Sequence, residues 1–124
     1  MSNPTVELII DSRYNEINVA GRDAGNQELL SGLIRLHILH HAVEEGLYGH
    51  WMIGELARHG YRISPGTLYP MLHGMERKGY LKSSVTGIGR RAPRMYRATA
   101  KGRRALAFAR ERVRELFGEL VEGR

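Results

Sequence analysis

The basic side chains of residues 77–104 are the clearest candidates for chemistry in this sequence. The segment carries ten Lys and Arg residues and no Asp or Glu, within a chain of formal net charge +6. Like charges at this density repel one another unless an anionic partner neutralises them, and such a cluster is typical of proteins that bind nucleic acid. A merely solvated face is the alternative, because runs of charge are often only that.

Histidines form a second group of chemically capable side chains. His37 and His41 are four residues apart, His40 lies between them, and Glu44 and Glu45 follow. One face of a helix could therefore present two ligands to zinc or copper. Two ligands do not make a site, and the spacing fixes no third ligand. We expect histidines of a helix surface or interface, and no bound metal.

Catalytic motifs are absent from the sequence. Gly87-Ile88-Gly89 is followed neither by the further glycine of a dinucleotide loop nor by the Gly-Lys-Ser/Thr of a phosphate loop, so it is a turn. The chain contains no Gly-x-Ser-x-Gly and no His-Glu-x-x-His. It also lacks cysteine, which excludes disulfides, zinc ribbons and thiol catalysis. We expect neither an enzyme nor a cofactor.

Length and composition limit the architecture. A chain of 124 residues is about one domain, and its 42% hydrophobic and 26% charged residues are ordinary for a soluble globular protein. No stretch reaches the roughly 20 apolar residues of a membrane span. The first ten residues lack the basic start and apolar run of a secretion signal. We expect a cytoplasmic protein without a membrane segment.

Residues 1–28 differ in pattern from the rest of the chain. Strand-prone residues alternate there with polar ones and are interrupted by Asn and Gly, which predicts a short hairpin or a flexible arm. Apolar residues then recur at three- and four-residue steps over residues 29–43, with Gly46 placed to end this helix. A second helix, starting near Trp51, ends at Gly60.

A third helix begins within a group of capping residues, and its first residue is ambiguous. Ser64 could cap it with Pro65 at the first helical position, but Pro70 would then lie mid-helix, where it removes a hydrogen bond. If Thr67 caps the helix instead, Pro70 falls in the first turn, where a missing N–H costs nothing. Gly79 ends this helix in either case.

A hairpin and a long helix complete the chain. Strand-compatible segments at 80–85 and 94–98 flank a turn with basic residues. Thr99 is the N-cap candidate for a final helix over residues 100–122, whose apolar residues keep the 3-4-3-4 spacing of a coiled-coil seam. Because this helix extends past the compact region, we expect a homodimer. The expected interface residues are Leu33, Leu106, Ala109, Val113, Leu116, Phe117 and Leu120.

Three short helices followed by a basic hairpin are the order of a winged helix-turn-helix. We therefore predict a mainly α fold with a small β-hairpin: an N-terminal arm or short hairpin (1–28), a winged helix-turn-helix DNA-binding domain (29–99) and a C-terminal dimerisation helix (100–124). The third helix would enter a major groove, with its positive N-terminal end near a phosphate or base edge. The residues expected to contact double-stranded DNA are Ser64, Gly66, Thr67, Tyr69, His73, Arg77, Lys82, Arg90, Arg91 and Arg94.

Two runs within this region, SPGTLYPML at 64–72 and MERKGYL at 75–81, resemble the recognition-helix signature of PadR-family transcriptional regulators. The resemblance continues through the wing strand and the threonine that leads into the last helix, and covers residues 29–115. It implies a dimeric winged-helix repressor, often relieved by a small effector near the dimer interface, of the short-tailed type with one C-terminal helix. Two departures stand out: Gly49-His50-Trp51 replaces the usual Gly-Tyr pair, and residues 1–28 match nothing in the family.

The residues and the resemblance together predict a sequence-specific DNA-binding regulator that represses transcription as a homodimer. Trp51 is the candidate effector-binding residue, because its ring could stack on an aromatic molecule, although a single Trp more often fills the core. The alternative function is a winged-helix protein-interaction adaptor, in which the arginines meet an acidic protein and no specific DNA is bound.

Overall fold

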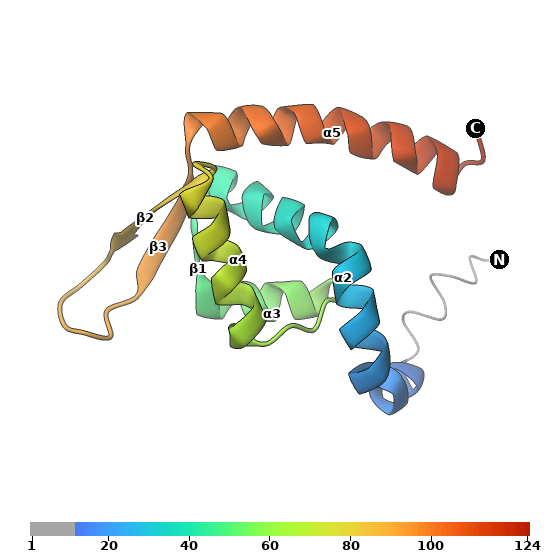
Figure 1. The fold of residues 1–124 in the computed structure, drawn as a ribbon, viewed down its shortest axis with the longest axis horizontal. Helices are drawn as coiled ribbons and strands as arrows, with labels where there is room; N and C mark the ends of the chain where they lie inside the picture. Colours follow the sequence, from blue (N-terminus) through green and yellow to red (C-terminus); the bar gives the residue numbers. More distant parts are fainter. Residues whose placement is uncertain (1–11) are drawn as a thin grey trace.

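The computed structural model describes the backbone of residues 12–124 and the side chains of residues 28–124. Its elements follow in the order α2 (Ser12–Glu44), β1 (Leu47–Tyr48), α3 (Gly49–Arg58), α4 (Pro65–Arg77), β2 (Leu81–Val85), β3 (Arg94–Ala98) and α5 (Ala100–Leu120). Figure 1 shows α3 and α4 beside the C-terminal part of α2, the β2–β3 hairpin extending away from them, and α5 running along the opposite side. This is the predicted winged helix-turn-helix with one long C-terminal helix.

The long helix α2 corrects the prediction for the N-terminal region. A hairpin or arm was expected over residues 1–28, but the backbone from Ser12 to Glu44 forms a helix of 33 residues that crosses the boundary placed after residue 28. No proline interrupts this range, so Gly21 and Gly25 weaken the helix without ending it. Residues 1–11, which belong to the same prediction, lie outside the described residues.

The end of α2 leads directly into a short strand that the sequence did not reveal. Gly46 has a φ of +82°, and the N–H groups of Glu45 and Gly46 both reach the His41 carbonyl, at 3.1 and 3.0 Å. Leu47 and Tyr48, which lie between the first two predicted helices, pair with β3. Two residues are too few to show the alternation that identifies a strand.

The start of α4 settles the ambiguity over its cap. Ser64 is the N-cap residue and Pro65 occupies the first helical position, so Pro70 lies inside the helix. Pro70 has no N–H to donate to the Gly66 carbonyl, and this loss is confined to the early turns. Gly79, at a φ of +87°, follows the C-cap residue and allows the chain to turn towards β2.

A three-stranded antiparallel sheet in the order β1-β3-β2 forms the wing and its base. The β2–β3 register runs from Leu81 opposite Ala98 to Val85 opposite Arg94, so the predicted hairpin is confirmed. One hydrophobic core joins the sheet to the helices. It includes Ile34 and Ile38 of α2, Leu56 of α3, Leu68 and Leu72 of α4, Leu81 of β2 and Tyr96 of β3.

Helix α5 is anchored at its first turn and exposed further on. Thr99 caps it by accepting from the Gly102 N–H at 3.0 Å and also donates to the Gly79 carbonyl at 2.5 Å. A Cβ at Gly102 would overlap the Tyr80 carbonyl oxygen, so only glycine allows this close approach. Beyond Leu106 most side chains of α5 are exposed, and the helix extends past the compact domain (Figure 1).

None of the described helices is both long and apolar enough to span a membrane.

Candidate nucleic-acid interface

The N-terminal end of α4 is open to solvent. Ser64, Pro65 and Gly66 are exposed, and Ser64 makes no side-chain cap. Its hydroxyl donates to Oγ1 of Thr67 at 3.4 Å instead. Pro65 has no N–H, and the N–H of Thr67 donates to the Ser64 carbonyl at 3.0 Å, so this end of α4 offers the exposed Gly66 N–H and the positive end of the helix dipole. This end of α4 can therefore receive a phosphate oxygen or a base edge.

Three residues of α4 that were predicted to contact DNA, Tyr69, His73 and Arg77, differ in their surroundings. His73 and Arg77 are exposed, as expected. Tyr69 is half-buried, because its ring packs against the start of α3, where a Cβ on Gly49 would lie 2.6 Å from Cε1 of Tyr69. The His73 ring lies beside it, with centroids 6.4 Å apart. Tyr69 thus packs α4 against α3, and only part of its ring is available to a ligand.

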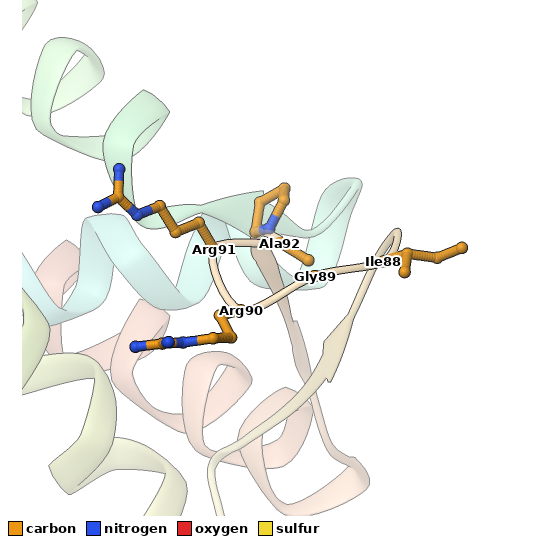
Figure 2. A pocket seen from close by; sticks show the side chains of 6 residues that line it. Ile88, Gly89, Arg90, Arg91 and Ala92 are labelled. Carbon is orange, nitrogen blue, oxygen red and sulfur yellow. The ribbon is translucent and has the colours of Figure 1, made fainter.

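The tip of the wing presents two arginines to solvent. Arg90 and Arg91 are exposed in the turn between β2 and β3, and residues 88–93 line an open hollow of ≈ 610 Å³. Figure 2 shows both arginine side chains extending to the same side of the tip, whereas the fully exposed Ile88 points to the other side. The two guanidinium groups can therefore act together on one anionic surface.

The strand register separates the remaining basic residues of the wing. Arg94 shares its face of the hairpin with Ser83, which contacts α4. Lys82 pairs with Arg97 on the opposite face, because successive side chains of a strand alternate. On that face Arg97 donates to the Glu45 carbonyl at 3.2 Å. Lys82, predicted to act with Arg94, therefore points away from the face that α4 adjoins.

Sequence reasoning missed a carboxylate at this surface. Oε2 of Glu76, on α4, accepts hydrogen bonds from the N–H and the hydroxyl of Ser83 at 3.2 and 2.8 Å. The Ser83 oxygen accepts from Nη1 of Arg94 at 3.2 Å. No spacing in the sequence indicates this contact, because it depends on how the hairpin folds back on α4.

An apolar stripe runs along the exposed part of α5. Val113, Leu116, Phe117 and Leu120 are all exposed. Leu106, predicted to lie in the same interface, is buried in the core of its own chain instead, and Ala109 is half-buried. Leu33 of α2, also predicted at the interface, is 38% exposed.

A family model described as the transcriptional regulator PadR-like family matches residues 38–108, more than half of the chain. The chain belongs to the PadR-like family of transcriptional regulators. The Transcriptional regulator Rv3488 of Mycobacterium tuberculosis is 48% identical over 97 residues, which are 78% of this chain and 91% of that protein. Because the family comprises transcriptional regulators, the prediction that this chain is not an enzyme is confirmed.

Solved structures agree with this assignment. The PadR family transcriptional regulator from Eggerthella lenta matches with a TM-score of 0.67 and 28% identity, over 91% of this chain and 99% of that one. A PadR-like transcriptional regulator from Bacillus cereus matches with a TM-score of 0.65 over 78% of this chain and 99% of that one, and at 24% identity it supports the fold alone.

In this PadR-like regulator the predicted histidine pair lies near a buried carboxylate. Glu55 of α3 is 8% exposed, and its Oε2 is 3.1 Å from Nε2 of His59 and 3.4 Å from Nε2 of His41. Its Oε1 accepts from Arg58 at 2.8 Å. His37 stacks on His59, with ring centroids 5.0 Å apart. The histidines therefore take part in the junction between α2 and α3, which their spacing in sequence did not indicate.

Burial and neighbouring charges shift the ionisation of this cluster. Desolvation, followed by repulsion from neighbouring imidazoles, lowers the pKa of His37 and of His41. Desolvation acts to raise the pKa of Glu55, but the hydrogen bond with His59 and the charges of Arg58 and His41 outweigh it, so this pKa is lowered. Among the side chains from residue 28 onwards, no group of three His, Asp or Glu residues is placed to hold a metal ion.

Trp51 and a groove elsewhere are the two candidate places for a small molecule. Trp51 is 47% exposed and lies edge-on to His41, with centroids 5.2 Å apart, so it does not fill the core. A groove of ≈ 240 Å³ lies between α2, α4 and α5, and Trp51 does not line it. Its lining residues are Arg35, Leu36, Leu39, Gly74, Met75, Lys78, Tyr80, Ala105 and Ala109.

Proposed function

We propose that this chain is a repressor that binds specific double-stranded DNA as a homodimer. The observation that carries the proposal is the exposed N-terminal end of α4 together with a wing that bears Arg90, Arg91 and Arg94 in an acid-free segment. Helix α4 would enter the major groove, and the wing tip would meet flanking phosphates or the minor groove.

Selection of bound sequences from random duplexes, followed by fluorescence anisotropy, tests DNA binding. We expect the selected duplex to bind roughly 10³-fold or more tightly than random duplex. We also expect the logarithm of affinity to fall with the logarithm of salt concentration, with a slope of about −0.9 for each neutralised phosphate. An adaptor that binds an acidic protein would show no preference among duplexes, and that result would favour the alternative function.

The exposed stripe of α5 supports the homodimer. Val113, Leu116, Phe117 and Leu120 form a continuous apolar surface that a second copy of the chain would cover. Two recognition helices related by a two-fold axis would then read half-sites about 34 Å, or one helical turn, apart. The selected sequences should accordingly be palindromic, and sedimentation should give twice the mass of the chain.

Repression and its relief form the regulatory part of the proposal. A dimer bound within a promoter would exclude polymerase, and transcription in vitro from such a template tests this directly. The groove between α2, α4 and α5 supports relief by a small effector, since it touches both α4 and the helix of the proposed dimer. Its apolar walls lie beside Arg35 and Lys78, a combination suited to a small aromatic carboxylate.

Thermal shift with a panel of aromatic acids tests the effector site. If the groove is the site, Lys78→Ala should abolish the rise in melting temperature that the aromatic acid produces, and Trp51→Phe should preserve it. The reverse pattern would favour Trp51, the effector-binding residue predicted from the sequence.

A further inference from the structure

An acidic side chain, Glu76 of α4, reaches into the wing. Its carboxylate accepts hydrogen bonds from both the N–H and the hydroxyl of Ser83 in β2. The same hydroxyl oxygen accepts a hydrogen bond from Nη1 of Arg94 in β3. One chain of hydrogen bonds therefore runs from α4 across both strands of the wing. Glu76 is half-buried, whereas Arg94 is exposed.

The position of Ser83 makes this contact a fixed point of the wing. Strand β2 is at the edge of the sheet, and Ser83 lies at its middle. Backbone N–H groups that point away from a sheet edge have no strand partner, and Glu76 supplies one for Ser83. A carboxylate is a stronger acceptor than a neutral group. The carboxylate thus ties the centre of β2 to α4.

The charge of Glu76 is unfavourable at a DNA-binding surface unless it has a compensating role. A carboxylate repels phosphates, and the 77–104 segment that follows has no acidic residue. Arg94 offers five N–H donors, of which the bond to Ser83 uses one. The other donors of an oriented Arg94 can meet a phosphate or the minor groove.

We propose that Glu76 is a positioning residue for DNA binding, which holds the wing and Arg94 in a fixed relation to α4 through Ser83. This inference rests on the proposed DNA-binding function. With the wing already ordered, less conformational freedom is lost when DNA binds. The sign of the effect separates this role from simple electrostatics, because removal of a negative charge would by itself strengthen binding.

The central experiment measures the affinity of Glu76→Ala for the selected duplex at constant salt. We expect affinity to fall about tenfold, as for the loss of hydrogen bonds to a charged group. Glu76→Gln keeps an acceptor oxygen and should remain within about threefold of the wild type. The matched control is Glu45→Gln, which removes the same charge from an exposed position and should leave affinity unchanged or slightly raised. Tighter binding by Glu76→Ala would overturn the proposal.

Two further readouts test whether Glu76 acts through Ser83 and Arg94. Ser83→Ala breaks the same chain of hydrogen bonds without altering α4, so it keeps the test valid if Glu76→Ala fails to fold. Both variants, like Arg94→Ala, should lower the magnitude of the salt slope by about 0.9. In an Arg94→Ala background, Glu76→Ala should lower the affinity for the duplex by less than about twofold, because substitutions of interacting residues do not have additive effects. Additive losses would show that Glu76 does not act through Arg94.

A measurement without DNA separates failure of this inference from failure of the proposed function. Hydrogen exchange at the Ser83 amide should be faster in Glu76→Ala than in the wild type, and equal rates would reject the contact in solution. If the wild type shows no preference among duplexes, the proposed function fails and the positioning role fails with it. If the wild type binds specifically and Glu76→Ala binds at least as well, only the positioning role is rejected.

Discussion

The ring of Tyr69 lies directly over the backbone of Gly49, so α4 and α3 meet where a side chain would not fit. A Cβ on Gly49 would lie 2.6 Å from Cε1 and 2.7 Å from the hydroxyl oxygen of Tyr69. We expect Gly49→Ala to destabilise the fold by about 1–2 kcal/mol, since overpacking outweighs the gain in helix propensity. Urea denaturation measures this change.

Gly54→Ala is the control for this prediction. Gly54 also lies in α3, and nothing lies within 4 Å of the Cβ that alanine would add. This variant should stabilise the protein by about 0.5–1 kcal/mol, the usual gain from glycine to alanine in a helix. In a Tyr69→Ala background the cost of Gly49→Ala should vanish. If the two glycine substitutions change the free energy of unfolding of the wild type equally, the Tyr69 ring can move aside without loss of stability.

Stability should decrease below neutral pH because of His37 and His41. Their pKa values in the folded protein lie below the ordinary value of 6.5, chiefly through desolvation. The unfolded chain therefore takes up protons first as pH falls. The stability that the two neutral histidines contribute is fully present above pH 6.5. It is lost as the pH falls from 6.5 through their pKa values in the folded protein, by at most about 1.4 kcal/mol per pH unit for each histidine.

Urea denaturation at a series of pH values checks this dependence. Glu55, whose pKa is also lowered, contributes stability above its ordinary value of 4.5 that is lost only at lower pH. The two effects are therefore separated on the pH axis. His37→Gln should flatten the curve below about pH 6.5. A wild-type curve that is flat over this range would contradict the prediction.

The fold was predictable where a local signal had one reading. Helix ends at Gly46, Gly60 and Gly79 and the cap at Thr99 follow from short-range backbone chemistry, and the structure agrees at each of them. The N-terminal region was predicted wrongly, because Ile17 and Val19 were interpreted as strand-prone residues but lie in helix α2. The strand at β1 depends on pairing with β3, which no local pattern reveals.

The site was predictable as a set of residue types but not as a geometry. Exposure of Arg90, Arg91 and His73 follows from their place in a turn or on the polar face of a helix. The side of the wing on which Lys82 lies depends on the strand register. The contact of Glu76 with Ser83 requires the tertiary fold, since the two residues lie in different elements, α4 and β2, with a turn between them.

The homodimer should depend on the exposed stripe of α5. We expect Val113→Glu combined with Leu116→Glu to give a monomer, because each subunit would then bring two carboxylates into an apolar interface. Sedimentation at micromolar concentration measures the mass. Glu115→Arg, a charge change on the opposite side of the same helix, should leave the dimer intact. A dimer that survives the double substitution would show that another surface joins the subunits.

Arg91 and Lys82 should differ in their contribution to DNA binding, although the sequence assigned them the same role. Arg91 extends from the wing tip beside Arg90, whereas Lys82 lies on the hairpin face opposite Arg94 (Figure 2 for the tip). Arg91→Ala should reduce the magnitude of the salt slope by about 0.9 and weaken binding to every duplex, as the loss of one phosphate contact does. Lys82→Ala removes the same charge and should leave the slope unchanged, because long-range attraction is screened beyond about 10 Å at 0.1 M salt. Salt titrations by anisotropy compare them directly, and equal changes in slope would mean that both faces of the wing contact DNA.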